Sequence, residues 1–333
     1  MSFMYQEDDG DLQHLSGRTV ACIGYGNMGR PCALNLRDSG VNIIVSDPTE
    51  EKRALAADEG FRVAAVDTCV LEADSLLLLI RDEVMPQVYI EQVSPYLRRG
   101  QSLIFSSAYN IAFGFIEAPA FVDVGLIAAR TLGTAVRERF VEGTGYTSFV
   151  AVGQDASRQA WQTVLALARA LGALRGGAIE IRFEQEAELD LFLQQAVLPI
   201  FHEAIIKAAD VLIRTGYPSD AVFTELYLSG ESSDYLHAAA RHGLLQALKS
   251  SSLTSQYGTL SRSQRIDDLK LERIMESTLD EIRSGRFARE WAREYAADYP
   301  RLKQLMKQRE QLDLWELEQQ TLDMLRRNQQ TGD

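Results

Sequence analysis

The stretch Gly24-Tyr25-Gly26-Asn27-Met28-Gly29 places glycines at the first, third and sixth positions of a GxGxxG motif. Residues 19–23 (TVACI) form a short apolar run before it, and residues 30–39 carry apolar residues at helical spacing after it. A strand, a glycine-rich turn and a helix in this order are typical of a dinucleotide-binding domain. The first glycine allows the tight bend, the second lets the backbone approach the pyrophosphate, and the third permits close packing of helix on strand. A glycine turn in a sheet protein that binds no cofactor is the alternative.

An acidic residue, Asp47, follows the next apolar run at residues 42–45. A carboxylate at this position accepts hydrogen bonds from ribose hydroxyls and repels a 2′-phosphate, which favours NADH over NADPH as the cofactor. Against this, four residues close by could bind a phosphate: Ser46, Thr49, Lys52 and Arg53. Asp47 could instead cap the following helix through Asp47-Pro48-Thr49. The candidate cofactor-binding residues are those of the glycine turn, together with Asp47 and Gly133.

Short apolar runs alternate with helical patterns as far as about Arg182. The further predicted strands are residues 75–79, 102–105, 125–129 and 148–152, and the further predicted helices are residues 50–59, 83–97 and 157–171. Strands and helices that alternate in this way imply right-handed βαβ units and a parallel sheet. We therefore predict an α/β Rossmann-type, dinucleotide-binding domain over residues 1–182.

The second half of the chain shows helical patterns without a convincing strand. We predict helices at residues 184–215, where Pro199 could introduce a kink, and at residues 267–283, 286–295 and 302–327. These form an all-α domain over residues 183–327 that binds substrate, followed by a flexible tail at residues 328–333. The pattern around Leu189 to Ile213 is apolar on too many faces for one short neighbour to cover, which predicts a homodimer through the helical domain.

The composition of the 333 residues is that of an ordinary globular protein, with 46% hydrophobic and 24% charged residues. The formal net charge of −13 repels phosphate backbones, so nucleic acid is not an expected partner. No apolar run approaches the ~20 residues of a membrane span, and the N-terminus lacks the apolar stretch of a signal peptide. Three cysteines and four histidines form neither a disulfide framework nor the spacing of a zinc site. These features predict a soluble, reduced, cytoplasmic protein with a small-molecule substrate and no membrane partner.

Ordered motifs extend over most of the chain. They are GYGNMG at residues 24–29, NIAFG at residues 110–114, DLFLQQAVL at residues 190–198, GYP at residues 216–218, SSSLTSQYG at residues 250–258 and IRSGRFAREW at residues 282–291. In this order they resemble GYGSQG, NIHFG, DLFGEQAVL, GYP, SISNTAEYG and IQSGKFAKEW of ketol-acid reductoisomerase (acetohydroxy acid isomeroreductase), in its short, class I form. The resemblance runs from Tyr5 to about Leu325.

This resemblance implies both a fold and an activity. The family converts 2-aceto-2-hydroxy acids to 2,3-dihydroxy acids. An alkyl group first migrates with the help of two Mg²⁺ ions, and NADPH then reduces the new ketone. The resemblance also implies a knotted helical domain and a dimer whose subunits share active sites.

The expected metal ligands depart from the family pattern. The family has two carboxylates four residues apart on one helix face, and here these positions are Asp190 and Gln194. Two glutamates of a partner helix align with Glu225 and Ser229 or, after a one-residue slip, with Thr224 and Leu228. Because Mg²⁺ needs charged oxygen ligands, we expect at most one ion, on Asp190 and Glu225, and no two-metal centre.

Two further departures concern catalysis. Ser107 stands where the family has a histidine, and Arg130 stands where it has a lysine. An arginine stays cationic but offers a planar fork instead of a point charge. The candidate catalytic residues are Arg130, Tyr109, Ser107, Asp190 and Glu225, and the candidate substrate-binding residues are Gln194, Ser250 and Ser252.

Several of these candidates have a structural alternative. Asp190 could pair with an arginine, Gln194 could be a structural hydrogen-bonding residue, and Tyr109 could be a packing residue. Glu186, Asp190 and Gln194 share a helix face, and an ordinary solvated face would look the same.

Three functions are consistent with this sequence. The first is an NAD(P)H-dependent reductase of a small keto acid, imine or related carbonyl, in a specialised pathway, which keeps hydride transfer without the two-Mg²⁺ alkyl migration. The alternative is a functional ketol-acid reductoisomerase of branched-chain amino acid biosynthesis with an unusual metal shell. The third is a non-catalytic nucleotide-binding protein. Turnover of a 2-aceto-2-hydroxy acid with Mg²⁺ separates the second from the first.

Overall fold

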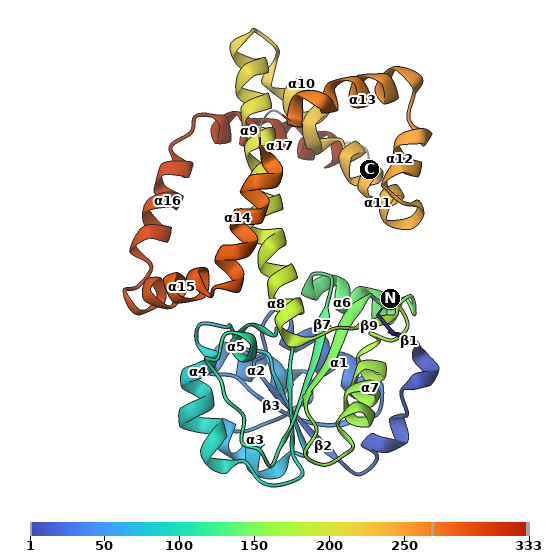
Figure 1. Cartoon of the computed structure of the whole chain (residues 1–333), viewed down its shortest axis with the longest axis vertical. Coiled ribbons are helices and arrows are strands. Elements are labelled where there is room, and N and C mark those ends of the chain that lie inside the picture. Colours follow the sequence, from blue (N-terminus) through green and yellow to red (C-terminus); the bar gives the residue numbers. More distant parts are fainter. Residues whose placement is uncertain (1, 268–269, 331–333) are drawn as a thin grey trace. The chain divides into compact units, whose positions relative to one another are not determined.

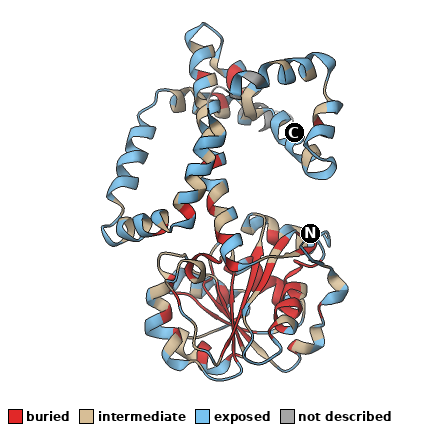
Figure 2. Cartoon of the chain, in the orientation of Figure 1, coloured by how far each residue is buried: buried red, intermediate tan, exposed pale blue. Residues whose placement is uncertain are grey.

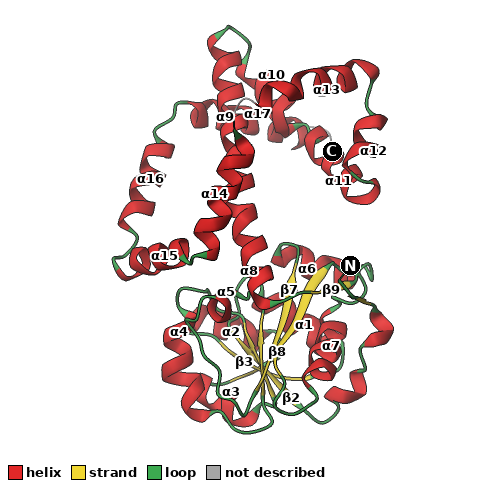
Figure 3. Cartoon of the chain, in the orientation of Figure 1, coloured by secondary structure: helices red, strands yellow, loops and turns green. Residues whose placement is uncertain are grey.

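The computed structural model describes residues 2–267 and 270–330 (Figure 1). The chain divides into two compact units, Met1–Asp190 and Leu191–Asp333. The first unit contains a sheet with helices, and the described residues of the second unit form helices without a strand (Figure 3). The predicted combination of an α/β Rossmann-type domain and an all-α domain is therefore confirmed.

The sheet has nine strands in the order β1-β9-β8-β7-β6-β5-β2-β3-β4. The parallel strands are β2 (Thr19–Ile23), β3 (Asn42–Ser46), β4 (Arg62–Val63), β5 (Ser75–Leu78), β6 (Ser102–Phe105) and β7 (Asp123–Ala129). Beyond β7 follow β8 (Ser148–Gln154), β9 (Ala178–Glu180) and β1 (Met4–Tyr5). The predicted strands are present, and the parallel arrangement holds from β4 to β7.

The prediction of a wholly parallel sheet is wrong at β8, which runs antiparallel to β7. The connection between them begins and ends at the same edge of the sheet, because the N–H of Arg130 donates to the carbonyl of Thr147. The helix in this connection, α6 (Gly133–Val141), therefore makes no crossover. Strands β1, β4 and β9 are only two or three residues long, and so short a strand shows no periodicity in the sequence.

Helices cover the sheet on both faces (Figure 1). They are α1 (Gly29–Asp38), α2 (Glu50–Asp58), α3 (Val66–Glu72), α4 (Met85–Val88) and α7 (Ala160–Leu171). Two further helices, α5 (Tyr109–Ala112) and α8 (Phe183–Phe192), follow β6 and β9 in the chain. Alternate residues of β2 face opposite layers: Val20 packs in the core with α1 and α7, and Ala21 packs in the core with α3. Because helices cover both faces of the sheet, the ends of the strands are where a ligand can approach it.

The helical unit follows the predicted pattern with differences at the helix boundaries. A π-helical turn at Leu193–Val197 is followed by α9 (Leu198–Arg214), α10 (Ser219–Phe223), a second π-helical turn at Thr224–Leu228, α11 (Glu231–His242), α12 (Leu244–Ser250), α13 (Leu253–Asp267), α14 (Leu271–Arg283), α15 (Arg286–Ala296), α16 (Pro300–Glu310) and α17 (Leu314–Gln330). Residues 331–333 of the predicted tail lie outside the described residues, whereas residues 328–330 are helical. Residues 267–283 do not form one helix, since Asp267 ends α13 and α14 begins at Leu271.

The prediction of one continuous helix over residues 302–327 is wrong. Helix α16 ends at Glu310, where the indole N–H of Trp315 donates to the carbonyl oxygen of Arg309 at 2.6 Å. This bond satisfies a carbonyl group at the end of α16 before α17 begins at Leu314. A side-chain cap of this kind cannot be read from apolar spacing.

Burial differs between the two units (Figure 2). Buried residues are concentrated in the sheet of the first unit and are sparse in the helices of the second. A small core in the helical unit contains Ala209, Val222 and Phe223, whereas Phe201 and Leu253 are exposed. Among the described residues, no helix combines the length and the apolar character that crossing a membrane requires.

Candidate active site

The carboxyl ends of β2, β5, β6 and β7 meet at one edge of the sheet, which we call the carboxyl edge. The chain proceeds outward from β2 to β3 and β4, then returns to β5 on the other side of β2, so the strand order reverses between β2 and β5. In open α/β sheets, ligands bind in the crevice at this point. A cavity of about 580 Å³ lies there, which we call the cofactor cavity; its walls include Gly24, Gly26, Asn27, Asp82 and Ser107.

Three glycines at or next to the glycine turn lie so close to backbone carbonyl groups that no side chain would fit there. Gly24 has φ +107°, and a Cβ on it would lie 2.6 Å from the carbonyl oxygen of Leu79. A Cβ on Gly29 would lie 1.9 Å from the carbonyl oxygen of Gly24, and a Cβ on Gly133 would lie 1.9 Å from that of Asn27. The turn thus packs tightly against β5, α1 and the first residue of α6, which holds its backbone in place.

Gly26 differs from these glycines, because the nearest atom to a Cβ at this position would be Nζ of Lys52, at 3.5 Å. Both Gly26 and Lys52 line the cofactor cavity. A side chain on Gly26 would occupy the part of the cofactor cavity that lies in front of the N-terminus of α1. The pyrophosphate of a dinucleotide carries negative charge. It could approach the backbone at Gly26 closely and interact with the N-terminus of α1 and the ammonium group of Lys52.

Asp47 is 6% exposed and connects two turns at the cavity wall. Its Oδ2 accepts the backbone N–H of Tyr25 at 2.7 Å, and its Oδ1 accepts the N–H and the hydroxyl of Thr49 at 2.8 and 2.6 Å. The alternative role, a local turn through Asp47-Pro48-Thr49, is therefore present. A carboxylate has about four acceptor positions, so one position stays for a ribose hydroxyl.

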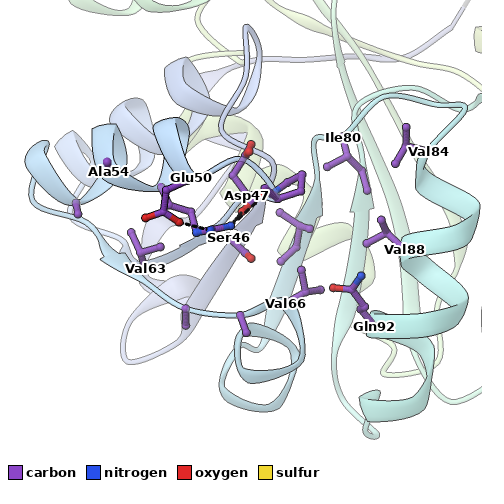
Figure 4. A pocket seen from close by; sticks show the side chains of 16 residues that line it. Ser46, Asp47, Glu50, Ala54, Val63, Val66, Ile80, Val84, Val88 and Gln92 are labelled. Carbon is purple, nitrogen blue, oxygen red and sulfur yellow. Dashed lines mark hydrogen bonds and ion pairs between the residues drawn. The ribbon is translucent and has the colours of Figure 1, made fainter.

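A second cavity of about 610 Å³ lies between β3, α2 and α4, and we call it the side cavity (Figure 4). Apolar side chains form much of its wall: Val63, Val66, Ile80, Val84 and Val88. Arg53 also lines this cavity, and its guanidinium donates a hydrogen bond to the carbonyl oxygen of Asp47 at 2.8 Å. Apolar walls next to Asp47 fit a purine ring beside a ribose, so the residues present fit NADH or NADPH.

Tyr25 contributes to the turn mainly through its backbone. Its side chain is 2% exposed, packs against Phe61, and donates its hydroxyl to Glu59 at 2.5 Å. Burial raises the pKa of Tyr25 above its ordinary value. The predicted turn residues Asn27 and Met28 line the cofactor cavity.

An ionic cluster lies beside the end of β7 and consists of Arg130, Glu186 and Asp190. The guanidinium of Arg130 donates to Glu186 at 2.9 Å and to Asp190 at 3.3 Å, and it lies over the ring of Phe149 at 5.0 Å. Glu186 is 1% exposed and also accepts the N–H of Ala108 at 2.9 Å. Burial raises the pKa of Glu186, and the N–H and the guanidinium oppose this rise. The alternative in which Asp190 pairs with an arginine is thus confirmed.

Ser107 and Tyr109 follow β6, and Asp82 follows β5. The Ser107 hydroxyl accepts the N–H of Tyr109 at 3.2 Å and donates to Oδ2 of Asp82 at 3.5 Å. The ring of Tyr109 stacks on Phe115, and its buried hydroxyl has no hydrogen-bond partner among the described residues. Burial raises the pKa of Tyr109, which favours the neutral phenol.

Sequence reasoning named Lys52 as a possible phosphate-binding residue, and the structure places it at the cofactor cavity, but it missed Asp82 and the role of Glu186 as the partner of Arg130. Asp82 had one usable signal, since it is the first carboxylate after the predicted strand at residues 75–79. The pairing of Glu186 with Arg130 has no signal in the sequence, because it depends on which segments the fold brings together.

The remaining candidates belong to the helical unit and are placed within it. Gln194 lies in the π-helical turn after α8, and Glu225 lies exposed in the second π-helical turn. Ser250 donates to the carbonyl of Gln246 at 3.0 Å, and Ser252 accepts the N–H of Ser255 at the start of α13. The two serines therefore have local roles in their helices.

Magnesium requires several charged oxygen ligands close together. The described residues of one chain contain no group of three or more histidine, cysteine, aspartate or glutamate side chains that could hold a metal ion. In the first unit, the guanidinium of Arg130 bonds to both Glu186 and Asp190. The two carboxylates of the first unit are therefore shared with a guanidinium.

Comparison with known proteins covers nearly the whole chain. Residues 14–177 match the family model described as acetohydroxy acid isomeroreductase, NADPH-binding domain, and residues 183–327 match ketol-acid reductoisomerase, C-terminal domain. The chain is 38% identical over 310 residues to ketol-acid reductoisomerase (NADP(+)) of Pyrobaculum aerophilum, covering 92% of this chain and 94% of the relative. It is 38% identical over 308 residues to that of Pyrobaculum neutrophilum, with the same coverage. A solved NADH-preferring ketol-acid reductoisomerase from an uncultured archean superposes with a TM-score of 0.90 at 29% identity, covering 96% of this chain and 98% of that one.

Proposed function

Because the chain belongs to the ketol-acid reductoisomerase family, we propose that it reduces the carbonyl group of a small acid with NADH or NADPH. The observation that carries this proposal is the pair of cavities along the carboxyl edge, one lined by the glycine turn and Asp47 and the other apolar. The cofactor cavity reaches Asp82, which lies close enough to the carboxylates of Glu186 and Asp190 to feel their charge, and Arg130 of the same ionic cluster is the cation that could face a negatively charged substrate group.

The residues of the chain have separable tasks in this reaction. The turn at residues 24–29 and Lys52 bind the pyrophosphate, and Asp47 accepts a ribose hydroxyl. When bound, the reduced nicotinamide supplies the hydride. Arg130 presents N–H groups that can orient a substrate carboxylate or stabilise a developing oxyanion.

The names of the relatives favour the complete isomeroreductase reaction over reduction alone. The Pyrobaculum proteins and the solved archaeal structure carry that name, and the matches extend over both units. This candidate, stated above as the alternative, therefore takes first place. It requires magnesium ligands in addition to the two carboxylates that cluster in the first unit.

Reduction without migration is the second candidate, and one specific observation favours it. Both nitrogen atoms at the end of the Arg130 side chain bond to the carboxylates Glu186 and Asp190, so a cation of the chain already offsets part of their negative charge. Gln194 brings no charge at a position where the resembled family has a carboxylate. Hydride transfer needs only positioning and one stabilised oxyanion, so it survives without two metal ions.

Two substrates separate these candidates. Alkyl migration converts a 2-aceto-2-hydroxy acid to its 3-hydroxy-2-keto isomer, which reduction converts to the 2,3-dihydroxy acid. A complete isomeroreductase oxidises NAD(P)H with either isomer and loses the first activity in EDTA. A reductase without migration uses the 3-hydroxy-2-keto acid alone and retains activity in EDTA. Tight cofactor binding with no turnover of these acids, or of other small keto acids and imines, would instead indicate a nucleotide-binding protein.

We also propose NADH as the preferred cofactor. A 2′-phosphate near Asp47 places like charges within a few ångströms, which costs on the order of a few kcal/mol at an effective dielectric constant near 20. The solved structure described as NADH-preferring supports this choice, whereas the names of the Pyrobaculum relatives specify NADP(+). Fluorescence titration of both cofactors decides, and tighter NADPH binding would reverse the preference.

We propose further that the helical unit forms a homodimer. Its helix α9 exposes Leu198 and Phe201, and the small core around Phe223 leaves such side chains uncovered within one chain. A second copy would cover them. Light scattering of the double variant Leu198→Glu/Phe201→Glu should show monomers where the wild type shows dimers, while Leu55→Glu on α2 leaves the dimer intact. A monomeric wild type at micromolar concentration contradicts this assembly.

A further inference from the structure

We propose that Asp82 is the proton donor of the reduction, protonating the carbonyl oxygen as the hydride arrives; this inference rests on the proposed function. Asp82 lies outside the candidates that the sequence indicates, and it touches the cofactor cavity directly.

Asp82 lies on the side of the cofactor cavity where the nicotinamide half of the cofactor is expected. Asp47 follows β3 and would bind the adenosine half of the dinucleotide. The turn after β2 would bind the pyrophosphate. The nicotinamide half therefore extends toward the ends of β5 and β6, on the opposite side of β2. Asp82 follows β5 and Ser107 follows β6, and both line that end of the cavity.

Hydrogen bonds hold the side chain of Asp82. Nδ2 of Asn110 donates to the backbone oxygen of Asp82 at 3.1 Å and to its Oδ1 at 3.4 Å. The Ser107 hydroxyl donates to Oδ2 at 3.5 Å while accepting the N–H of Tyr109. These contacts fix the carboxyl group on loops that follow two neighbouring strands, and Asp82 is still partly exposed to the cavity.

The electrostatic surroundings keep a proton available near neutral pH. Burial, together with the carboxylates of Glu83, Glu186 and Asp190, raises the pKa of Asp82 to about 7, and the Ser107 hydroxyl opposes the rise. The nearby cations are engaged elsewhere: Arg81 pairs with Glu83 at 3.5 Å, and Arg130 pairs with the other two carboxylates. General acids work best when their pKa is near the working pH.

Reduction of the carbonyl group moves one hydride and one proton. The carbonyl carbon accepts a hydride with its electron pair from the reduced nicotinamide, which becomes oxidised, and a C–H bond forms. The π bond of the carbonyl breaks, its electron pair moves to oxygen, and this oxygen takes the proton of the Asp82 carboxyl. The Asp82 carboxylate then regains a proton from water through the open cavity.

The experiment compares Asp82→Asn with the wild type on the 3-hydroxy-2-keto acid. We expect kcat at pH 7 to fall about 100-fold or more, the range lost with a general acid, while the Kd for NADH measured by fluorescence changes less than about threefold. In the wild type kcat falls above about pH 7 as Asp82 ionises, and in the variant this dependence is absent. The matched control is Asp123→Asn. Asp123 is 3% exposed and lies at the start of β7, at the other end of the strands, so this variant should keep the wild-type kcat and pH profile.

The outcomes separate this inference from the proposed function. A wild type that reduces the acid, together with an Asp82→Asn variant whose kcat stays within threefold and follows the same pH profile, overturns the role of Asp82 alone. A wild type that reduces no carbonyl acid overturns the proposed function, and the proton donor with it. If Asp82→Asn does not fold, the wild-type profile decides: a kcat that stays constant from pH 6 to 9 overturns the inference, and partial activity of Asp82→Glu supports it.

Discussion

Replacing Arg130 with methionine should destabilise the first unit in a pH-dependent way. The substitution keeps an unbranched side chain over Phe149 but removes both ion pairs. Glu186, which is 1% exposed, then keeps the N–H of Ala108 as a hydrogen-bond donor. Removing one partner of a buried pair costs about 3–5 kcal/mol. Because the Arg130 side chain is 26% exposed, we expect a cost at or just below the lower limit of that range, about 2–3 kcal/mol.

The pH dependence follows from Glu186. Burial raises the pKa of this residue in the folded protein, and loss of the guanidinium raises it further. Below the ordinary glutamate pKa the carboxyl is neutral in both states, so the variant loses little. As the pH rises through the raised pKa, the folded variant must hold an uncompensated charge. The destabilisation should therefore be larger at pH 8 than at pH 5.

Thermal unfolding followed by circular dichroism measures this effect. A loss of 2–3 kcal/mol lowers the Tm of a unit of this size by roughly 4–12 °C. Adding Glu186→Gln should restore much of the loss, since the glutamine oxygen still accepts from Ala108. Arg62→Met, which breaks the exposed Arg62–Glu72 pair, is the control and should change the Tm by less than about 2 °C. An Arg130→Met variant with the wild-type Tm at pH 8, or an equal loss at both pH values, would refute the reasoning.

Three further predictions concern the cofactor cavity. Gly133→Ala drives a Cβ into the carbonyl oxygen of Asn27 and should weaken NADH binding at least tenfold in a fluorescence titration, whereas Gly258→Ala, with no atom within 4 Å, should not change it. Asp47→Ser should shift the ratio of NADPH to NADH affinity toward NADPH by about tenfold, because a like charge is removed; an unchanged ratio would contradict our assignment of Asp47. Asp82→Asn should raise the free energy of unfolding above pH 7 by about 1–3 kcal/mol, a value that allows for water in the cavity. The pKa of Asp82 is raised in the folded protein, so its ionised carboxyl group destabilises the fold at high pH, and this cost disappears at low pH. Urea unfolding at pH 5 and pH 8.5 checks it, and equal stabilities of variant and wild type at the higher pH count against it.

The parts of the fold that the sequence predicts well are those with local signals. The run TVACI at residues 19–23 ends at a glycine turn, and both its strand and the helix after it appear where the pattern places them. The antiparallel β8 was not predictable, because the sequence shows an apolar run at residues 148–152 without showing at which edge it starts.

The candidate site was predictable only in part, for the same physical reason. The glycine turn and Asp47 follow from spacing along the chain, whereas the contact of Arg130 with Glu186 joins residues 56 positions apart. Asp82 acquires its surroundings because β5 lies between β2 and β6, a neighbour relation that no short pattern encodes. Tyr109 is a packed aromatic residue in the structure, and its catalytic role stays a prediction.

The central claim, hydride transfer to a small carbonyl acid, has one direct measurement. The protein is mixed with a 3-hydroxy-2-keto acid and NADH that carries deuterium at the transferable position of the nicotinamide, and the product is examined by mass spectrometry and NMR. We predict a 2,3-dihydroxy acid with deuterium on the former carbonyl carbon and one oxidised cofactor for each product molecule. Absence of deuterium in the product, with the cofactor still reduced when NADH and NADPH are tried in turn, would contradict the account.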